Sequence, residues 1–272
     1  MARGADAGKK ASKGGIGETT RFLLIFVLAA LFLRTFIVAP FMIPSGSMLP
    51  DLMIGDYLFV AKWPYGYSRY SFPFGLASFD GRILAGEPKR GDVVVFRYPG
   101  EDKDLVKRLI GLPGDRIQMQ GGQLILNERR VPKVRVADFL VPLTPNSPCR
   151  HVGPEPEAPV TEKGASFCRY PRFRETLPGG RSYEVLDQYP SPADDTGIFT
   201  VPAGHYFMMG DNRDDSADSR IPRAEQGVAM LPKDYVIGRV MIAFFSTDGS
   251  AEWIKPWTWF SAARWERVGR TY

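Results

Sequence analysis

The stretch PFMIPSGSMLP, residues 40–50, follows directly on an apolar segment and is the most informative part of the chain. Ser45 and Ser47 flank a glycine, and Pro44 and Pro50 restrict the backbone on either side. The sequence therefore predicts a constrained loop that exposes hydroxyls and backbone N–H groups, with a candidate nucleophile beside the apolar segment. A Ser-Gly-Ser triplet is also typical of an ordinary polar loop, so its interpretation depends on the rest of the chain.

The apolar segment before this loop is long enough to cross a membrane. Residues 22–33 are apolar without interruption, and after Arg34 the apolar sequence continues to residue 39. Because a helix needs about 20 residues to span a bilayer, residues 22–40 suffice if the Arg34 side chain extends toward the headgroups. We therefore expect a transmembrane anchor over residues 22–40.

The charges that precede the anchor predict its orientation. Residues 1–21 contain five basic and two acidic residues, and the positive-inside rule keeps such a tail in the cytoplasm and exports the rest. A cleaved signal peptide is the alternative, because the apolar run resembles its hydrophobic region and Ala30 or Ala39 could precede a cleavage site. Pro40 would obstruct cleavage after Ala39, so an uncleaved anchor is the favoured interpretation.

The composition favours short strands over long helices. The 272 residues include 23 prolines and 28 glycines, and 44% are hydrophobic, which suffices for one core with an appended lobe. The net charge of +5 is dispersed, which favours a membrane surface over nucleic acid as the charged partner.

Cysteine and histidine are scarce. Cys149 and Cys168 could pair in an exported protein, but their separation in sequence does not decide between a disulfide and two thiols. The two histidines lie far apart and no CxxC motif occurs, so we expect no metal site and no cofactor.

Apolar and valine-rich runs predict strands at residues 56–61, 92–96, 105–110, 201–209 and 235–245, and a hairpin over 123–135 that turns near Asn127 and Glu128. A polar, proline-rich insertion covers about residues 140–200. We expect a mostly β protein with one N-terminal transmembrane helix. Its parts would be an antiparallel, partly barrel-like catalytic core from residues 41–117 and 201–272, and a β-rich insertion lobe at residues 118–200.

Lys107 is a candidate partner of the serine loop. In the expected strand at residues 105–110 side chains alternate, so Lys107 shares its face with Leu105 and Leu109. If that face is buried, desolvation lowers the pKa of the amine, which can then act as a general base near pH 7. A lysine in a strand is more commonly a surface residue, so this interpretation needs a serine nearby.

Residues 209–220, MGDNRDDSADSR, form a loop that is dense in short polar side chains. Its spacing superficially resembles a calcium-binding loop, but Arg213 occupies a ligand position and Ser216 replaces the required glycine. A purely structural turn held by Asp–Arg pairs is the alternative for most of these residues, particularly Asp211, Arg213, Asp214 and Arg220. We expect the loop to organise hydrogen bonds rather than a metal ion.

These three elements, in this order, resemble those of bacterial type I signal peptidases. PSGSM at residues 44–48 is similar to the family's nucleophile box, KRLIGLPGD at residues 107–115 to its lysine box, and GDNRDDSADSR at residues 210–220 to its C-terminal box. Gly238 and Arg239 also match. The resemblance covers residues 34–120 and 200–245 well. It implies a membrane-anchored serine endopeptidase that removes signal peptides from exported preproteins after small residues, in an Ala-X-Ala pattern.

Carried over to this sequence, the resemblance implies that Ser47 is the nucleophile and Lys107 its general base. Ser45 would help to stabilise the oxyanion. Ser216 would hydrogen-bond the Lys107 amine and orient it, and Asp218 would support the loop.

The resemblance also implies shallow apolar pockets for alanine, lined by Ile43, Pro44, Met48, Leu52, Val95, Leu105 and Val106. One position departs from the family: Asp215 stands where asparagine is usual, which leaves the local charge near the dyad open. The implied location is the bacterial cytoplasmic (inner) membrane, crossed once, with the catalytic domain on the periplasmic side. The implied partners are signal peptides and membrane lipid, with the secretion translocon as a further candidate and no nucleic acid.

One alternative concerns the catalytic residues, and two belong to other classes of protein. A Ser-His-Asp triad would need His205, because His151 lies in the insertion, and we expect His205 to be structural. A self-cleaving Ser-Lys regulator is disfavoured by the anchor and by the lack of a helix-turn-helix pattern. A catalytically silent, membrane-anchored β scaffold would have no need for Ser47, Lys107 and Ser216 together.

The C-terminus is rich in tryptophan and basic residues, namely Trp253, Trp257, Trp259 and Trp265 with Lys255, Arg264, Arg267 and Arg270. Docking at a membrane interface and ordinary core packing both fit this pattern.

Overall fold

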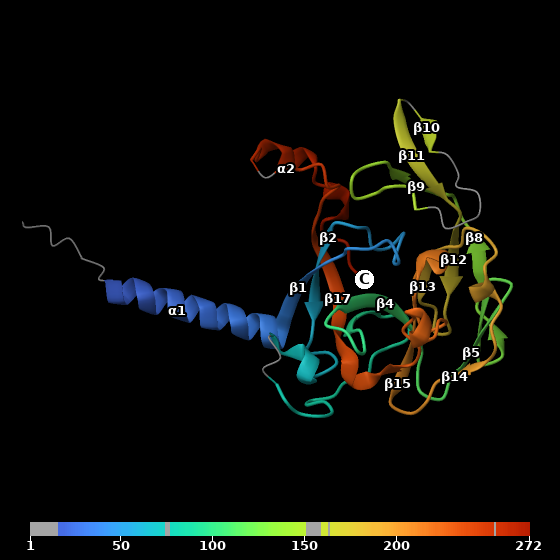
Figure 1. Ribbon diagram of the computed structural model, residues 1–272, viewed down its shortest axis with the longest axis horizontal. Coiled ribbons are helices and arrows are strands. Elements are labelled where there is room, and N and C mark those ends of the chain that lie inside the picture. Colours follow the sequence, from blue (N-terminus) through green and yellow to red (C-terminus); the bar gives the residue numbers. More distant parts are fainter. Residues whose placement is uncertain (1–15, 74–76, 151–158, 163, 253) are drawn as a thin grey trace, which may run out of the picture.

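The computed structural model describes residues 16–73, 77–150, 159–162, 164–252 and 254–272. Helix α1 (Ile16–Phe32) extends away from the body of the protein (Figure 1), and residues Leu33–Ile37 continue it in a wider helical turn. The span Gly17–Ile37 is long and apolar enough to cross a membrane. The apolar side chains of α1, such as Phe22 at 68% exposure, are exposed, and only near the end of the span does Phe36 pack against Tyr67 and Phe72 of the body. A helix that exposes apolar side chains all round is suited to a bilayer.

The body is built from seventeen strands and one short helix in the described residues. Their bounds are β1 Val38–Met42, β2 Asp56–Ala61, β3 Val93–Arg97, β4 Asp104–Gly111, β5 Arg116–Gln120, β6 Gln123–Leu126, β7 Arg129–Arg130, β8 Lys133–Arg135, β9 Phe139–Pro142, β10 Val160–Glu162, β11 Ala165–Tyr170, β12 Arg172–Thr176, β13 Ser182–Leu186, β14 Phe199–Thr200, β15 His205–Met209, β16 Leu231–Pro232, β17 Val236–Ser246 and α2 Trp257–Ser261. The protein is therefore mostly β, as expected from the sequence.

The main sheet has the strand order β1-β2-β17-β3-β4-β15-β16, and every neighbouring pair is antiparallel. It joins strands from both sides of the insertion and curves into a half-barrel. Strand β1 lies at the edge of this sheet, which is where a strand can accommodate a proline such as Pro40. Because β1 begins at Val38, the last three residues of the expected anchor, 38–40, belong to the sheet.

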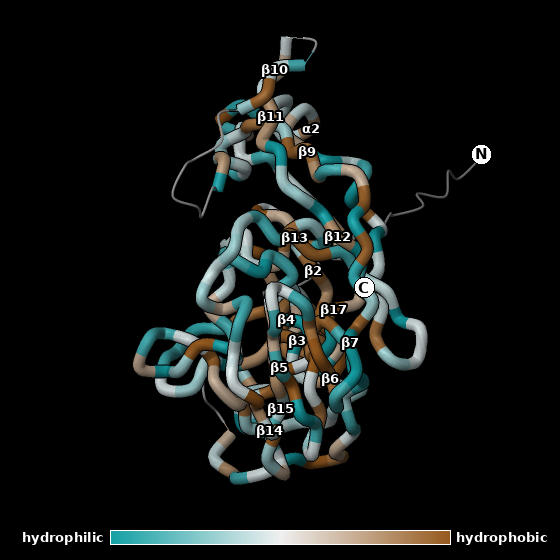
Figure 2. The backbone as a smooth tube through the Cα atoms, turned by 90° about the vertical axis from the view of Figure 1, so that its right-hand side faces the viewer, coloured by the Kyte–Doolittle hydropathy of each residue, from teal (hydrophilic) through white to brown (hydrophobic). Residues whose placement is uncertain are grey.

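Strand β3 is buried on both faces, which explains its uninterrupted run of valines. Val93 and Val95 pack in one cluster with Ile43, whereas Val94 and Phe96 pack in another on the opposite side. A strand covered on both faces shows continuous hydrophobic sequence instead of alternation. Figure 2 shows the hydrophobic residues concentrated along the strands in the middle of the body, with hydrophilic loops around them.

The insertion adds three smaller sheets, with the orders β10-β11-β9, β13-β12-β8 and β14-β5-β6-β7. Leu124 and Val185 of these sheets pack against Ile110 and Phe207 of the main sheet. A disulfide joins Cys149 to Cys168 and settles the pairing that the sequence left open.

The hairpin predicted over residues 123–135 is only partly correct. Strands β6 and β7 pair across Asn127 and Glu128, which both have positive φ, as the expected turn requires. Strand β8, however, pairs with β12 of the insertion and does not belong to the hairpin. Alternation predicts a strand but not its partner.

Candidate active site

Ser47 lies in the loop between β1 and β2, and its hydroxyl contacts the amine of Lys107. Lys107 is in β4, opposite Val94 of β3, and its Nζ lies 2.5 Å from Ser47 Oγ. The Lys107 residue is only 4% exposed. The main sheet thus brings together the serine and the lysine that the sequence singled out.

Burial lowers the pKa of Lys107 from 10.5 to about 8. The carboxylates of Asp218, Asp211 and Asp215 oppose this effect, and the Arg220 guanidinium adds to it. A fraction of the Lys107 amines is therefore neutral near pH 7. A neutral amine in contact with a hydroxyl can accept its proton.

The loop at residues 210–220 holds the serine loop through its backbone. The Asn212 N–H donates to the Ser47 carbonyl oxygen at 3.1 Å, and Asn212 Nδ2 donates to the Gly46 carbonyl oxygen at 3.1 Å. A Cβ at Gly210 would lie 2.6 Å from the Ser47 carbonyl oxygen, so this close approach needs glycine. Sequence reasoning missed Asn212, because a polar loop signals hydrogen bonds without naming their acceptors.

Asp218 orders the base of this loop. It is fully buried, accepts the Gly210 N–H at 2.9 Å, and binds the Arg220 guanidinium through both carboxylate oxygens. Burial alone would raise the pKa of Asp218, but the charge and hydrogen bonds of Arg220 outweigh burial and lower it. Asp218 therefore remains an anion near Lys107.

Two buried ion pairs fix the same loop to its surroundings. Arg108 of β4 binds Asp211 through two hydrogen bonds of 2.8 and 2.6 Å, and Arg213 binds Glu175 through two of 2.7 and 2.6 Å. Removing one partner of such a pair costs about 3–5 kcal/mol, because the other charge stays buried. Glu175 belongs to β12 of the insertion, so the insertion helps to position the loop, which no local sequence signal indicated.

The two accessory serines differ in their surroundings. Ser45 is exposed, and its Oγ lies 3.5 Å from Ser47 Oγ. Ser216 Oγ is buried but has no hydrogen-bond partner in the described part of the chain, so the expected hydrogen bond to Lys107 is not formed in this structure. It packs tightly against Gly210, where a Cβ would lie 2.2 Å from Ser216 Oγ.

Asp215, which stands where asparagine is usual, forms an ion pair with Arg150. Arg150 Nε donates to its Oδ2 at 2.5 Å and Arg150 Nη2 to its Oδ1 at 3.0 Å. Arg150 follows the disulfide-bonded Cys149, and its Cδ would lie 3.0 Å from a Cβ at Gly46. A side chain from the insertion therefore covers the serine loop and neutralises the additional carboxylate.

A largely apolar pocket of about 130 Å³ opens beside Ser47 and Lys107. Five of the seven residues expected to bind substrate line it: Ile43, Pro44, Met48, Leu105 and Val106. Leu52 and Val95 do not line it, because both are fully buried in the cluster that contains Ile43 and Met48. They can act on the pocket only by supporting its wall.

His205 lies at the start of β15, where its Nδ1 is 3.0 Å from the Ala203 carbonyl oxygen. No hydrogen bond joins it to Ser47 within the residues that the structure describes. His151 lies outside those residues. Among the described residues, the triad interpretation therefore has no histidine in contact with Ser47.

One group of carboxylates in the described ranges could hold a metal ion. Oxygen atoms of Asp187, Asp194 and Asp214 lie within 4.8 Å of one another. The ammonium group of Lys133 already binds Asp187. None of these residues takes part in the contact between Ser47 and Lys107.

The fold and the site together define a class of protein. An apolar N-terminal helix carries an antiparallel β body in which a serine hydroxyl contacts a buried amine rather than an imidazole. This is the arrangement of serine hydrolases that use lysine as the base.

Comparison with known proteins gives the family. Residues 16–245 match the family described as "Signal peptidase, peptidase S26". Signal peptidase I of Rickettsia typhi is 36% identical over 231 residues, 81% of this chain and 77% of that protein, and that of Rickettsia canadensis is 37% identical over the same shares. A crystal structure of a signal peptidase I from Enterococcus faecalis covers 56% of this chain and 96% of its own, with 22% identity and a TM-score of 0.29.

The chain belongs to the signal peptidase family, peptidase S26, and acts as a signal peptidase I that removes signal peptides from secreted preproteins. The family assignment therefore argues against the two alternatives, a self-cleaving regulator and a catalytically silent scaffold.

Proposed function

We propose that Ser47 is the nucleophile of this signal peptidase and Lys107 its general base. The observation that carries the proposal is the 2.5 Å contact between Ser47 Oγ and a buried Lys107 Nζ whose pKa is lowered to about 8. Lys107 accepts the hydroxyl proton as Ser47 Oγ attacks the scissile carbonyl carbon, and then donates it to the amine that leaves. The product is an acyl-enzyme ester on Ser47.

The second half of the reaction repeats these roles with water. Lys107 takes a proton from a water molecule that attacks the ester carbonyl, and Ser47 Oγ leaves with that proton. The Ser47 backbone N–H and the exposed Ser45 hydroxyl stabilise the oxyanion in both halves, an effect typically worth about 3 kcal/mol per donor. We assign Asp218 to fixing the loop that carries Ser216, and we propose that the Ser216 hydroxyl, which has no hydrogen-bond partner among the described residues, turns to the Lys107 amine during the reaction.

The test uses the full chain in detergent with a preprotein whose signal ends in Ala-X-Ala. Wild type, Ser47→Ala and Lys107→Ala are compared, and mass spectrometry locates the cut. Wild type should cut after the second alanine and both variants should be inactive. His205→Ala is the control that should keep most activity, and the opposite result for Lys107 and His205 would overturn the dyad.

We infer that the apolar pocket beside Ser47 selects small residues before the cut. Its volume of about 130 Å³, with Ile43 and Val106 in its wall, suits alanine better than a long side chain. Ile43→Ala should relax the preference for alanine, and the cleavage sites from a peptide library should broaden. Unchanged cleavage sites would count against this assignment.

We propose that α1 is a single-pass anchor of the cytoplasmic membrane, with the N-terminal tail inside and the catalytic body outside. The basic tail supports this orientation. Protease added outside spheroplasts should digest the body, and protection of the body would show the opposite orientation.

We also propose the division into a catalytic core of residues 41–117 and 201–272 and an insertion lobe of residues 118–200. The translocon remains a candidate partner.

We propose that α2 touches the same membrane. It lies on the side of the body from which α1 extends (Figure 1) and exposes Trp257 and Phe260 by 70% and 71%. Tryptophan favours the headgroup region of a bilayer. Arg264 and Arg267 do not contribute lipid contacts, because they reach inward to Ser246 and Asp56, and Trp253 lies outside the described residues. Vesicle binding by a chain that lacks residues 1–39 tests this, and no binding would refute it.

A further inference from the structure

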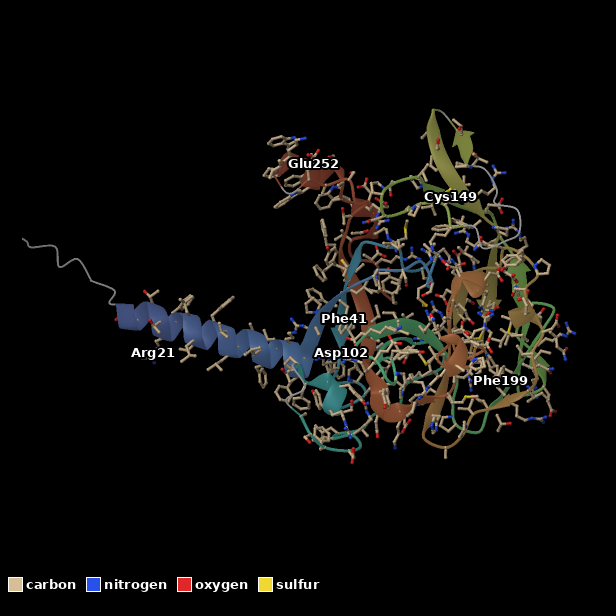
Figure 3. The ribbon with its side chains drawn as sticks, in the orientation of Figure 1. Arg21, Phe41, Asp102, Cys149, Phe199 and Glu252 are labelled. Atoms are coloured by element: carbon tan, nitrogen blue, oxygen red, sulfur yellow. A yellow bond between two sulfur atoms is a disulfide. The ribbon has the colours of Figure 1, made fainter. Side chains whose placement is uncertain are left out.

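A second, larger cavity lies where the anchor helix joins the main sheet. Its volume is about 800 Å³, and residues from the end of the anchor, from β1 and from the segment after β2 line it. Figure 3 shows Phe41 and Asp102, two of the lining residues, near the point where α1 meets the body. The Lys62 N–H donates to the carbonyl oxygen of Ile37 at 3.2 Å, and Ile37 is the last residue of the apolar span. The cavity therefore lies at the level where the span ends.

Four cations line this cavity, and two of them already have carboxylate partners. Arg97 binds both Asp104 and Asp102, and Arg69 binds Asp80. These two cations face three carboxylates, so one negative charge is in excess here, and the Asp102 side chain is 92% exposed to solvent.

The other two cations, Arg34 and Lys62, have no ion pair with a carboxylate in the described part of the chain. Lys62 is 5% exposed, and its Nζ donates to the carbonyl oxygen of Ser71 at 2.5 Å. Burial, and to a smaller extent the charge of Arg34, lower the pKa of Lys62 from 10.5 to about 8, and Asp104 partly opposes them. Two cations that lie near one another without an ion pair repel, and an anion bound between them would offset that repulsion.

We propose that this cavity binds the phosphate group of an anionic phospholipid, with Arg34 and Lys62 as its ligands. The inference rests on the proposed membrane anchorage of α1 but not on the catalytic roles of Ser47 and Lys107. A phosphate has the charge and the acceptor oxygens that a guanidinium and an ammonium group bind. The cavity lies at the end of the span, where headgroups lie, so a lipid supplies this phosphate at high local concentration whereas solution does not.

The test measures lipid binding by the full chain in detergent, by native mass spectrometry and by thermal unfolding. The probes are phosphatidylglycerol, phosphatidylcholine and inorganic phosphate. The variants are Arg34→Gln and Lys62→Met, with Arg21→Gln as the matched control, because Arg21 lies near the other end of the same helix. Arg34 is exposed at the helix end, so its variant keeps the test valid if Lys62→Met does not fold.

Phosphatidylglycerol should remain bound to the wild type and raise its unfolding temperature. Arg34→Gln and Lys62→Met should each lower the affinity for phosphatidylglycerol about fivefold. Arg21→Gln should bind as the wild type does, and phosphatidylcholine should bind more weakly to all. Equal stabilisation by inorganic phosphate would show an anion site that is not specific for lipid, and would overturn the assignment. Equal binding of both lipids, or no effect of Arg34→Gln, would do so too.

Two further outcomes separate this inference from the proposed function. A wild type that cleaves a preprotein but retains no phosphatidylglycerol refutes the lipid site and leaves the dyad intact. A wild type that binds the lipid through Arg34 but does not cleave refutes the dyad alone. If a signal peptide, and not the lipid, gives a shift that depends on Arg34, the cavity extends the peptide site and the lipid proposal is wrong.

Discussion

Lys107 and Lys62 are two buried lysines of the same β body whose pKa values are lowered to nearly the same value. Each is about 95% buried, and burial is the largest cause that lowers the pKa of each to about 8. Their contacts differ. The Lys107 amine meets a hydroxyl, Ser47 Oγ, whereas the Lys62 amine meets the carbonyl oxygen of Ser71.

This difference shows that a lowered pKa does not by itself make a base. A carbonyl oxygen has no proton to give, and the Ser71 hydroxyl is directed to the Ser68 N–H instead. The carboxylates near Lys107 belong to a loop that also holds the Ser47 backbone in place. In the proposed mechanism, the group that the amine contacts decides whether it acts as a base, and Lys62 serves as an internal reference for Lys107.

The largest expected effect is the loss of activity on replacing one lysine but not the other. Lys107→Met removes the proposed base and should lower kcat/KM by a factor of about 10²–10⁴ or more. Lys62→Met makes the same change in a similar environment and should cost less than about tenfold. Cleavage of a preprotein in detergent without added lipid measures both. Equal losses would show that buried charge, rather than contact with Ser47, matters.

Stability should depend on pH through both lysines. A lysine whose pKa is lowered in the folded state binds fewer protons there than in the unfolded chain, so stability increases as pH rises from about 8 to about 10.5. Each amine contributes up to about 3 kcal/mol across this interval. Denaturant unfolding of wild type, Lys62→Met and Lys107→Met at several pH values gives the two contributions by difference. A variant whose slope equals that of the wild type would show that its lysine is not perturbed.

The local part of this comparison could be predicted from the sequence. Alternation of Lys107 with Leu105 and Leu109 indicated a buried amine, and PSGSM beside the apolar span supplied a serine. Strands and their polar loops leave such short-range patterns. The apolar N-terminal helix left an equally clear pattern in residues 22–33.

The long-range part could not be predicted. Glu175 and Arg150 reach the site from the insertion, and a single charged residue in a polar segment carries no signal of its partner. Lys62 follows β2 without any pattern that would indicate burial, because the Ile37 and Ser71 groups that enclose it come from other parts of the chain. Leu52 and Val95 were expected in the pocket wall and lie behind it, since apolar type does not distinguish a lining residue from a supporting one.

The rate of cleavage should follow the protonation state of Lys107. Only the neutral amine can accept the Ser47 proton, so kcat/KM should increase about tenfold per pH unit below a value near 8 and then level off. Lys62→Met should leave this profile in place. A profile centred near pH 6.5 would indicate a histidine as the base. A profile that shifts in Lys62→Met would show that the rate follows the protonation of Lys62 and not that of Lys107.

The smallest expected effect concerns Arg150, which pairs with one of the carboxylates that surround Lys107. Asp215 raises the pKa of Lys107 even while it is paired with Arg150. In Arg150→Gln the unpaired carboxylate should favour the ammonium form, so the pH profile of kcat/KM should move upward by about half a unit, since the pair is partly exposed. The rate near pH 7 should then decrease about threefold.

Asp215→Asn and the double variant complete this test. Asp215→Asn removes the carboxylate and should move the profile to lower pH, and adding Arg150→Gln to it should have almost no further effect on the profile. The non-additivity would show that Arg150 acts through Asp215 rather than by covering Gly46. If the double variant moved upward as far as Arg150→Gln alone, the contact of Arg150 with the serine loop, and not its charge, would set the reactivity of Ser47.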